Sequence, residues 1–348
     1  MMNKTTWQRV KLGEIAEFSN GKSRPNNVGN IPIYGGNGVL GYADESNCKD
    51  ETIILGRVGA YCGCVYYENQ PIWVSDNALI AKPKNHNSIK YIYYLLKYMN
   101  LNSHAQGSSH PLITQSLLNS LEVEVCVDYE AQQRIAEILS SLDDKIDLLH
   151  RQNKTLESLA LTLFRHTFIE NPKRNEWQIG KLGDYVKIVY GKNLPTKNLL
   201  KQGYAVFGGN GKIGYFDKYI YEEPQVLISC RGEASGKVNI SERKSFITNN
   251  SLILERTKDE HITFEYLKYW CLSNNFSTYV SGSAQPQITI EGLYSADFLK
   301  PNFNVIREFS EIVLSLENKI SHNIKEIQNL ESLRDIMLPK LLSGEMEV

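Results

Sequence analysis

Two long segments of the chain, residues 130–168 and 304–343, place apolar residues at helical spacing. Apolar side chains return every seven positions in both, and a heptad register of this length predicts helices that pair as a coiled coil. The predicted seam residues are Ile135, Leu142, Leu149, Asn153, Leu156 and Leu163 in the first segment and Leu316, Asn323, Leu330 and Met337 in the second. The two asparagines either fix the register of the helix pair or face solvent at a loose point of the seam.

The remaining segments carry short apolar runs bounded by Gly, Asn and Asp. Residues 31–34, 52–55 and 78–80 are runs of this kind and predict β-strands, while residues 89–99 predict a short helix. Residues 36–41 match the dinucleotide-binding pattern GxGxxG formally, but no amphipathic helix follows them, so we interpret them as a hairpin turn. The pattern favours compact α+β globules.

The two halves of the chain repeat each other in the same order. WQRVKLGE at Trp7 returns as WQIGKLGD at Trp177, and IPIYGGNGVLGY at residues 31–42 returns as YAVFGGNGKIGY at 204–215. SDNALI returns as TNNSLI, and GSSHPLIT as GSAQPQIT. A period near 174 residues is the size of a whole domain, so the repeat indicates a tandem duplication rather than a solenoid.

This duplication predicts four segments. Residues 1–128 and 177–302 are the two globules, and residues 129–176 and 303–348 are the two helical segments. Antiparallel packing of the two helices would relate the halves by a pseudo-two-fold axis. A helix over 131–167 would be ~55 Å long and would act as a spacer between the globules.

Bulk composition excludes several classes of protein. The chain has 348 residues, 42% of them hydrophobic, and a net charge of −1, which by itself gives no sign of a nucleic-acid partner. Its parts differ, however, because the first globule is neutral, the second carries +3 and the helical segments together carry −4. No signal peptide and no apolar run of about 20 residues is visible, so we expect a cytoplasmic protein without membrane contact. The six cysteines form no CxxC pair and predict free thiols.

Catalytic motifs are missing from the sequence. Gly21-Lys22-Ser23 resembles the end of a P-loop, but the leading glycine is replaced by Ala16. The seven histidines form no metal-binding spacing, and no pair of carboxylates recurs in both copies. The sequence therefore predicts a protein without catalytic residues, metal or cofactor of its own.

The chain resembles the specificity (S) subunit of type I restriction–modification enzymes over nearly its whole length. The most specific matches are QRIAEIL at residues 133–139, LESL at 156–159, GSAQPQIT at 282–289 and LPKLLSGE at 338–345. The chain is short for this family, and its first helix lacks the short tandem repeat that tunes spacer length, which leaves the half-site spacing open.

The resemblance implies two target recognition domains, each reading one half of a bipartite, asymmetric double-stranded DNA sequence. It implies that the helices dock two methyltransferase (modification) subunits, which bring S-adenosylmethionine and methylate adenine. Restriction subunits would add ATP- and Mg-dependent translocation and cleavage. Two alternatives are a coiled-coil interaction scaffold and a self-contained DNA-modifying enzyme with an unrecognised site.

Candidate DNA-contacting residues are polar or basic side chains on loops that could enter a groove or approach phosphates. In the first globule they are Lys22, Arg24, Arg57, Ser108, Ser109, His110 and Gln115. In the second they are Lys192, Lys197, Lys212, Arg231, Lys237, Gln285 and Gln287. Where matched positions differ, as at His110 and Gln285 or at Leu112 and Gln287, the two copies are expected to read different sequences.

Overall fold

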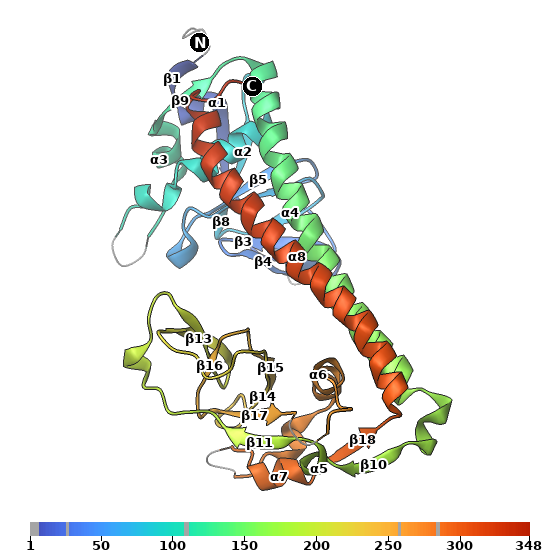
Figure 1. The fold of residues 1–348 in the computed structure, drawn as a ribbon. Coiled ribbons are helices and arrows are strands. Elements are labelled where there is room, and N and C mark those ends of the chain that lie inside the picture. Colours follow the sequence, from blue (N-terminus) through green and yellow to red (C-terminus); the bar gives the residue numbers. More distant parts are fainter. Residues whose placement is uncertain (1–6, 26–27, 108–110, 257–258, 283–285) are drawn as a thin grey trace. The chain divides into compact units, whose positions relative to one another are not determined.

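The computed structural model describes residues 7–25, 28–107, 111–256, 259–282 and 286–348 (Figure 1). It divides into two compact units. Unit 1 comprises residues 1–150 and 324–348, and unit 2 comprises residues 151–323. Each unit therefore contains one globule together with a part of each long helix, and we describe the two units one at a time.

Unit 1 is built on two small sheets and a separate strand pair. The four-stranded antiparallel sheet has the order β2 (Ala16–Asn20), β8 (Ala78–Pro83), β5 (Thr52–Gly56), β6 (Val65–Glu68). The three-stranded sheet has the order β4 (Gly38–Ala43), β3 (Ile31–Gly35), β7 (Trp73–Val74), and β1 (Trp7–Lys11) pairs with β9 (Glu122–Cys126). The predicted strands at 31–34, 52–55 and 78–80 are confirmed, and residues 36–37 form the turn of the β3–β4 hairpin.

Unit 2 repeats this arrangement strand for strand. Its four-stranded sheet has the order β11 (Lys187–Tyr190), β17 (Ser251–Glu255), β14 (Val226–Ser229), β15 (Val238–Ile240). Its three-stranded sheet has the order β13 (Gly211–Phe216), β12 (Tyr204–Gly208), β16 (Phe246–Ile247), and β10 (Gln178–Lys181) pairs with β18 (Asp297–Lys300). The duplication seen in the sequence thus extends to topology.

Short helices occupy matching positions in the two copies. They are α1 (Leu12–Ile15), α2 (Ile89–Tyr98) and α3 (Gln115–Ser120) in unit 1, and α5 (Leu182–Tyr185), α6 (Phe264–Ser273) and α7 (Ile290–Tyr294) in unit 2. Ser88 caps α2 and Thr263 caps α6, in each case by accepting a hydrogen bond from the amide three residues on. These caps satisfy amides that the first helical turn leaves without a partner.

The two predicted long helices are confirmed as α4 (Tyr129–Phe164) and α8 (Phe303–Leu342). In unit 1, Ile146 and Leu149 of α4 pack with Ile327 and Leu330 of α8. In unit 2, the bonded or packed pairs are Asn153 with Asn323 and Phe164 with Phe309. Within unit 2, the later residue of α4 pairs with the earlier residue of α8, so the two helices are antiparallel. No helix within the described residues is long and apolar enough to cross a membrane.

The predicted seam residues differ in burial. Ile135, Leu149, Asn153 and Asn323 are buried, whereas Leu142, Leu156, Leu163, Leu316, Leu330 and Met337 are partly buried. Towards the end of α4 the buried residues are Ala160 and Phe164, which lie four positions apart. The heptad spacing therefore gives way to ordinary helical spacing where α4 enters the core of unit 2.

The long helices complete the core of each globule. In unit 1, α4 contributes Ile135 and Leu139, and the end of α8 contributes Leu341 and Leu342, all of them buried. In unit 2, the corresponding core is aromatic. Its central rings belong to Phe164, Phe168, Tyr266, Phe298 and Phe309. Each globule thus shares one hydrophobic core with its parts of the long helices.

Candidate nucleic-acid interface

Several loops of unit 1 meet beside the β3–β4 hairpin turn. We define loop cluster 1 as residue 22 and residues 36–38, 57–64, 75–77 and 111–113. Backbone hydrogen bonds run from Lys22 N to Val74 O (3.0 Å), from Arg57 N to Asn77 O (3.1 Å) and from Gly59 N to Pro111 O (3.0 Å). Ser75 N also donates to Tyr34 O (2.8 Å) on β3, close to the hairpin turn. Loops that are far apart in sequence therefore form one surface held by main-chain groups.

Unit 2 brings the matching loops together through matching bonds. We define loop cluster 2 as residue 192 and residues 209–211, 230–237, 248–250 and 286–288. The bonds run from Lys192 N to Ile247 O (2.9 Å), Cys230 N to Asn250 O (3.0 Å) and Gly232 N to Pro286 O (3.0 Å). Since the joining groups are backbone atoms, the side chains in the two clusters can differ without changing the frame.

Two glycines in each cluster set the course of the loop after the central strand. Gly59 and Gly232 both have φ of +74°, while Gly63 and Gly236 have φ of +88° and +92°. Side-chain-bearing residues rarely adopt this left-handed region, so glycine is favoured at all four positions. The glycine pattern shared by the two halves is therefore a requirement of the loop backbone.

An isolated antiparallel bridge lies next to the first of these glycines in each copy. Val58 pairs with Leu112 in loop cluster 1, and Arg231 pairs with Gln287 in loop cluster 2. Paired residues of an antiparallel bridge direct their side chains to the same face. The same backbone position thus presents an apolar pair in one copy and a polar, positively charged pair in the other.

The candidate residues of unit 1 occupy different places. Lys22 and Arg57 belong to loop cluster 1, and Lys22 is exposed. Arg24 lies against β4, where its guanidinium donates to Leu40 O (3.3 Å). The Gln115 amide lies within 3.2 Å of the backbone of β2 at Phe18 and Asn20. Three candidates, Ser108, Ser109 and His110, lie outside the described residues.

Unit 2 places more of its candidates together. Lys192, Arg231, Lys237 and Gln287 all belong to loop cluster 2 and are exposed. The Lys237 ammonium donates to Asn210 Oδ1 at the hairpin turn (2.7 Å). Lys197 lies apart in a short 3-10 helix, and Gln285 lies outside the described residues.

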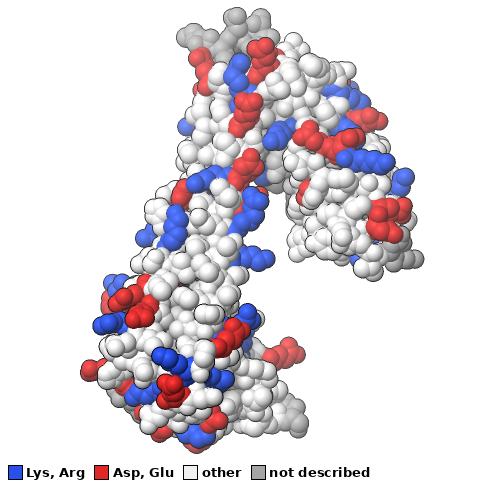
Figure 2. All heavy atoms as spheres, turned by 90° about the vertical axis from the view of Figure 1, so that its right-hand side faces the viewer, with Lys and Arg blue, Asp and Glu red and all other residues white. Residues whose placement is uncertain are grey.

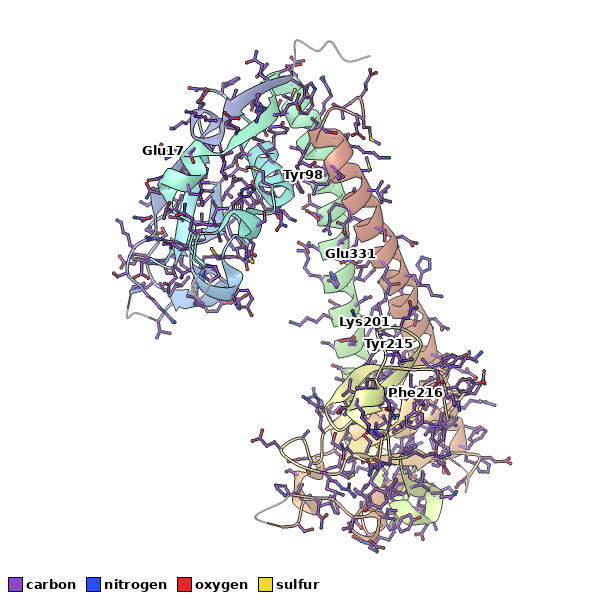
Figure 3. All side chains as sticks on the ribbon, turned by 90° about the vertical axis from the view of Figure 1, so that its left-hand side faces the viewer. Glu17, Tyr98, Lys201, Tyr215, Phe216 and Glu331 are labelled. Carbon is purple, nitrogen blue, oxygen red and sulfur yellow. The ribbon has the colours of Figure 1, made fainter. Side chains whose placement is uncertain are left out.

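Lys212 on β13 already has partners within unit 2. Its ammonium lies 3.0 Å from Glu242 Oε1 and 4.6 Å from the centre of the Tyr215 ring. Burial lowers the pKa of Lys212, but the hydrogen bond and charge of Glu242 outweigh it and raise the pKa overall. A second lysine, Lys201, lies beside Tyr215 and Phe216 at the end of the same hairpin (Figure 3). Lys201 and Lys212 are both exposed, but Lys212 is ion-paired with Glu242, so Lys212 is the weaker candidate for a phosphate contact.

Asparagines of the clusters were not among the candidates named from the sequence. Asn37, Asn77, Asn210 and Asn250 are exposed at the hairpin turns and at the turns after Ser75 and Thr248. Amides of this kind can pair with base edges. These asparagines recur in both halves of the sequence, in GGNG and in the matched segments SDN and TNN. This recurrence could have identified them as candidates.

Two buried hydroxyls lie beneath these turns at equivalent positions. Among the described residues, Ser75 Oγ and Thr248 Oγ1 have no hydrogen-bond partner.

The described residues also hold no group of three or more His, Cys, Asp or Glu side chains that could bind a metal ion. On the face seen in Figure 2, basic and acidic side chains lie intermixed. The clusters therefore combine hydrogen-bonding groups with scattered positive charge, an arrangement suited to binding.

The chain is similar to a known protein family and to individual curated proteins. The family described as the type I restriction modification DNA specificity domain matches residues 4–158 and 174–332. The MjaIX type I restriction enzyme specificity subunit of Methanocaldococcus jannaschii is 26% identical over 98% of this chain and 94% of that protein. A putative type I specificity subunit of Mycoplasma genitalium is 24% identical over 88% of this chain and 85% of that protein.

The fold also has a counterpart among solved structures. The crystal structure of a type I restriction–modification S subunit from M. genitalium superposes with a TM-score of 0.68. The two chains are 19% identical, and the match covers 98% of each. At this identity the likeness shows a shared fold of two globules with long helices.

Proposed function

The chain belongs to the family of type I restriction–modification DNA specificity domains, which matches both of its halves, and we propose the following account of how it recognises its target. Each loop cluster contacts one half of a bipartite, asymmetric double-stranded DNA sequence. The chain acts as the specificity subunit and contributes recognition, while other subunits carry out the chemistry.

The observation that carries this proposal is the difference at the paired bridges. Val58 and Leu112 occupy the position in unit 1 that Arg231 and Gln287 occupy in unit 2. Two loop clusters that share a backbone conformation but differ in their side chains suit a DNA target whose two halves have different sequences. A scaffold that bound one protein partner twice would be expected to keep the same side chains in both copies.

The charges of the clusters fit a subunit that shares its DNA clamp with partners. Exposed lysines such as Lys22, Lys192 and Lys237 can neutralise phosphates, and phosphate contacts supply most sequence-independent affinity. The chain as a whole is close to neutral. We therefore propose that partner subunits contribute further positive charge around the duplex.

The outer faces of the long helices provide surfaces for those partners. Exposed apolar residues on them are Leu148, Leu159 and Leu161 of α4 and Ile312, Leu314, Ile324, Leu333 and Ile336 of α8. Leu333 and Ile336 are three positions apart and lie on one side of α8, where neighbouring exposed apolar residues suit contact with another protein. We propose that two methyltransferase subunits dock here with S-adenosylmethionine, and that restriction subunits add ATP- and Mg-dependent cleavage.

DNA binding is tested by changing Lys192 and Lys237 to Ala in the chain assembled with its methyltransferase subunits. If both lysines contact phosphates, affinity falls and the slope of log Kd against log salt decreases by about 1–2, because each phosphate contact contributes about 0.9. Titrations at several salt concentrations measure the slope. Lys181→Ala is the control, since Lys181 is paired with Asp297 on β18, outside the cluster (2.6 Å). An unchanged slope in the double variant rejects the phosphate role.

Docking is tested on α8 with Leu333→Asp combined with Ile336→Asp. Placing two carboxylates on the exposed apolar face is expected to abolish co-purification with the methyltransferase subunit. Gln328→Asp on the same helix is the control, because Gln328 is exposed and polar already. Glu331, labelled in Figure 3, marks this stretch of α8. If the double variant still co-purifies, the proposed docking face is wrong.

A further inference from the structure

The paired bridges of the two clusters hold matched backbone positions but differ in the chemistry and in the exposure of their side chains. Val58 has extended backbone (φ −134°, ψ 153°) and is 40% exposed, and its partner Leu112 is partly buried. Arg231 and Gln287 are both exposed. Extended neighbours alternate in direction, so Arg57, which precedes Val58, points to the opposite face.

The loop is open at the glycine beside each bridge. Gly59 follows Val58 and Gly232 follows Arg231, and an added Cβ at either glycine would meet no atom within 4 Å. The frame beneath is held by main-chain bonds, such as Ile113 N to Arg57 O (2.9 Å) and Ile288 N to Cys230 O (3.0 Å). The side chains of the bridge are therefore not needed to hold the loops together.

Each pair has the chemistry of a different set of base edges. Arginine donates two hydrogen bonds to O6 and N7 of guanine, and glutamine pairs with N6 and N7 of adenine in the major groove. Apolar side chains instead contact the C5-methyl group of thymine. No other base edge in the major groove offers an apolar group to Val58 and Leu112.

We propose that this bridge pair is a specificity-determining pair in each copy. Arg231 and Gln287 read purine edges, with Arg231 on guanine, in one half-site. Val58 and Leu112 read a thymine methyl group in the other. This inference rests on the proposed function and deepens it, by assigning base classes to one backbone position.

The alternative assignment, a phosphate contact at the bridge, fits only one of the two copies. A phosphate requires a donor or a positive charge, and neither Val58 nor Leu112 has one in its side chain. Lys22 and Lys192 hold matched positions in both copies, each bridged to the turn at Ser75 or Thr248. Phosphate contact therefore suits the lysines, and base contact suits the bridge pair.

The test exchanges the pairs in the full chain assembled with its methyltransferase subunits. One variant carries Val58→Arg and Leu112→Gln, and the other carries Arg231→Val and Gln287→Leu. Each complex selects duplexes from a randomised library, and sequencing gives the base preference at every position. Circular dichroism and thermal unfolding check that each variant is folded, and Lys181→Ala is the matched control.

We expect each variant to change preference at one or two adjacent positions of one half-site and to leave the other half-site unaltered. The Arg231→Val, Gln287→Leu variant should lose about 10- to 100-fold discrimination for purines there, the range of a good bidentate contact. The Val58→Arg, Leu112→Gln variant should lose its thymine preference.

Base analogues test the same assignment with the unaltered protein. We call the half-site that loop cluster 1 contacts the first and the other the second. Replacing the thymine of the first half-site with deoxyuridine removes only the methyl group, and we expect binding to weaken about 3- to 5-fold, as for one buried methyl group. Replacing the guanine of the second half-site with 7-deazaguanine removes N7 and should weaken binding by a larger factor. In the Val58→Arg, Leu112→Gln variant, deoxyuridine should have no effect.

The possible failures are distinguishable. If the unaltered complex selects no bipartite sequence, the proposed function itself is wrong. If it selects one, but the exchanged variants are folded and keep the original base preferences with uniformly weaker binding, the bridge pair does not determine specificity. A bipartite target with no thymine in the half-site that loop cluster 1 contacts would also overturn the assignment of Val58 and Leu112.

Discussion

The two copies share a backbone frame but present different surfaces. Both have the same sheet orders, the same capped helices and the same bonds between loops. At matched positions, however, loop cluster 1 has Val58, Cys64 and Leu112, where loop cluster 2 has Arg231, Lys237 and Gln287. Main-chain hydrogen bonds and left-handed glycines therefore fix these loops, which leaves their side chains free to diverge.

The cores of the two units differ as well, at equally matched positions. Leu342 of α8 is buried in unit 1, and Phe168, one period of 174 residues earlier, is buried in unit 2. Phe168 lies 6.0 Å from the Trp177 ring and packs against Tyr266 and Phe309. An aromatic side chain in unit 2 thus occupies the position that an aliphatic side chain occupies in unit 1.

The largest effect we expect from breaking this match comes from Phe168→Ala. Removal of the ring leaves a cavity among Phe164, Tyr266 and Phe309, and the free energy of unfolding of unit 2 should fall by about 3–5 kcal/mol. Leu342→Ala is the matched change in unit 1, where about 2–5 kcal/mol is expected. Hydrogen exchange followed by mass spectrometry reports the two units separately.

If the Phe168→Ala variant loses hydrogen-exchange protection equally in both units, the two cores are not independent. That result would mean that the copies unfold as one cooperative body rather than as two cores. Phe168→Leu serves as the milder variant, since it keeps an apolar side chain in place and should lose less stability than the alanine.

Sequence periodicity predicted the long helices and the strands, because apolar spacing reports burial directly. It did not predict that Phe164 rather than Leu163 would be buried, since the helix changes from heptad to ordinary spacing as it enters the globule. The aromatic cluster around Phe168 was also missed. That cluster joins Phe168 to Tyr266 and Phe309, which lie 98 and 141 positions further along the chain, and no local pattern encodes such contacts.

The loop clusters were only partly predictable. Basic residues such as Lys192 and Lys237 could be named, because charge on a glycine-rich loop is visible in the sequence. The pairing of Arg231 with Gln287 required the structure, since 56 positions separate them and a single bridge joins them. The DNA-contacting roles of all these residues stay predictions.

A smaller effect is expected at the helix pair, where the units again differ. Unit 2 buries Asn323 completely, and its Nδ2 donates to Asn153 Oδ1 (2.8 Å) and to Gln152 Oε1 (2.8 Å). Unit 1 instead packs Ile146 against Ile327. Asn323→Leu should cost unit 2 about 1–3 kcal/mol, because the buried Asn153 amide then loses its partner.

The double variant Asn153→Leu, Asn323→Leu should recover most of that loss, since both buried amides, including the Asn323 Oδ1 that has no partner, are then removed, and the exposed Gln152 can hydrogen-bond to water. Denaturant unfolding of the two single variants and the double variant closes a double-mutant cycle and gives the coupling energy between the two asparagines. Ile327→Leu in unit 1 is the control and should change stability by less than about 1.5 kcal/mol. A coupling energy near zero would show that the hydrogen bond adds nothing to unit 2, and the asparagines would then have no part in fixing the register of the helices.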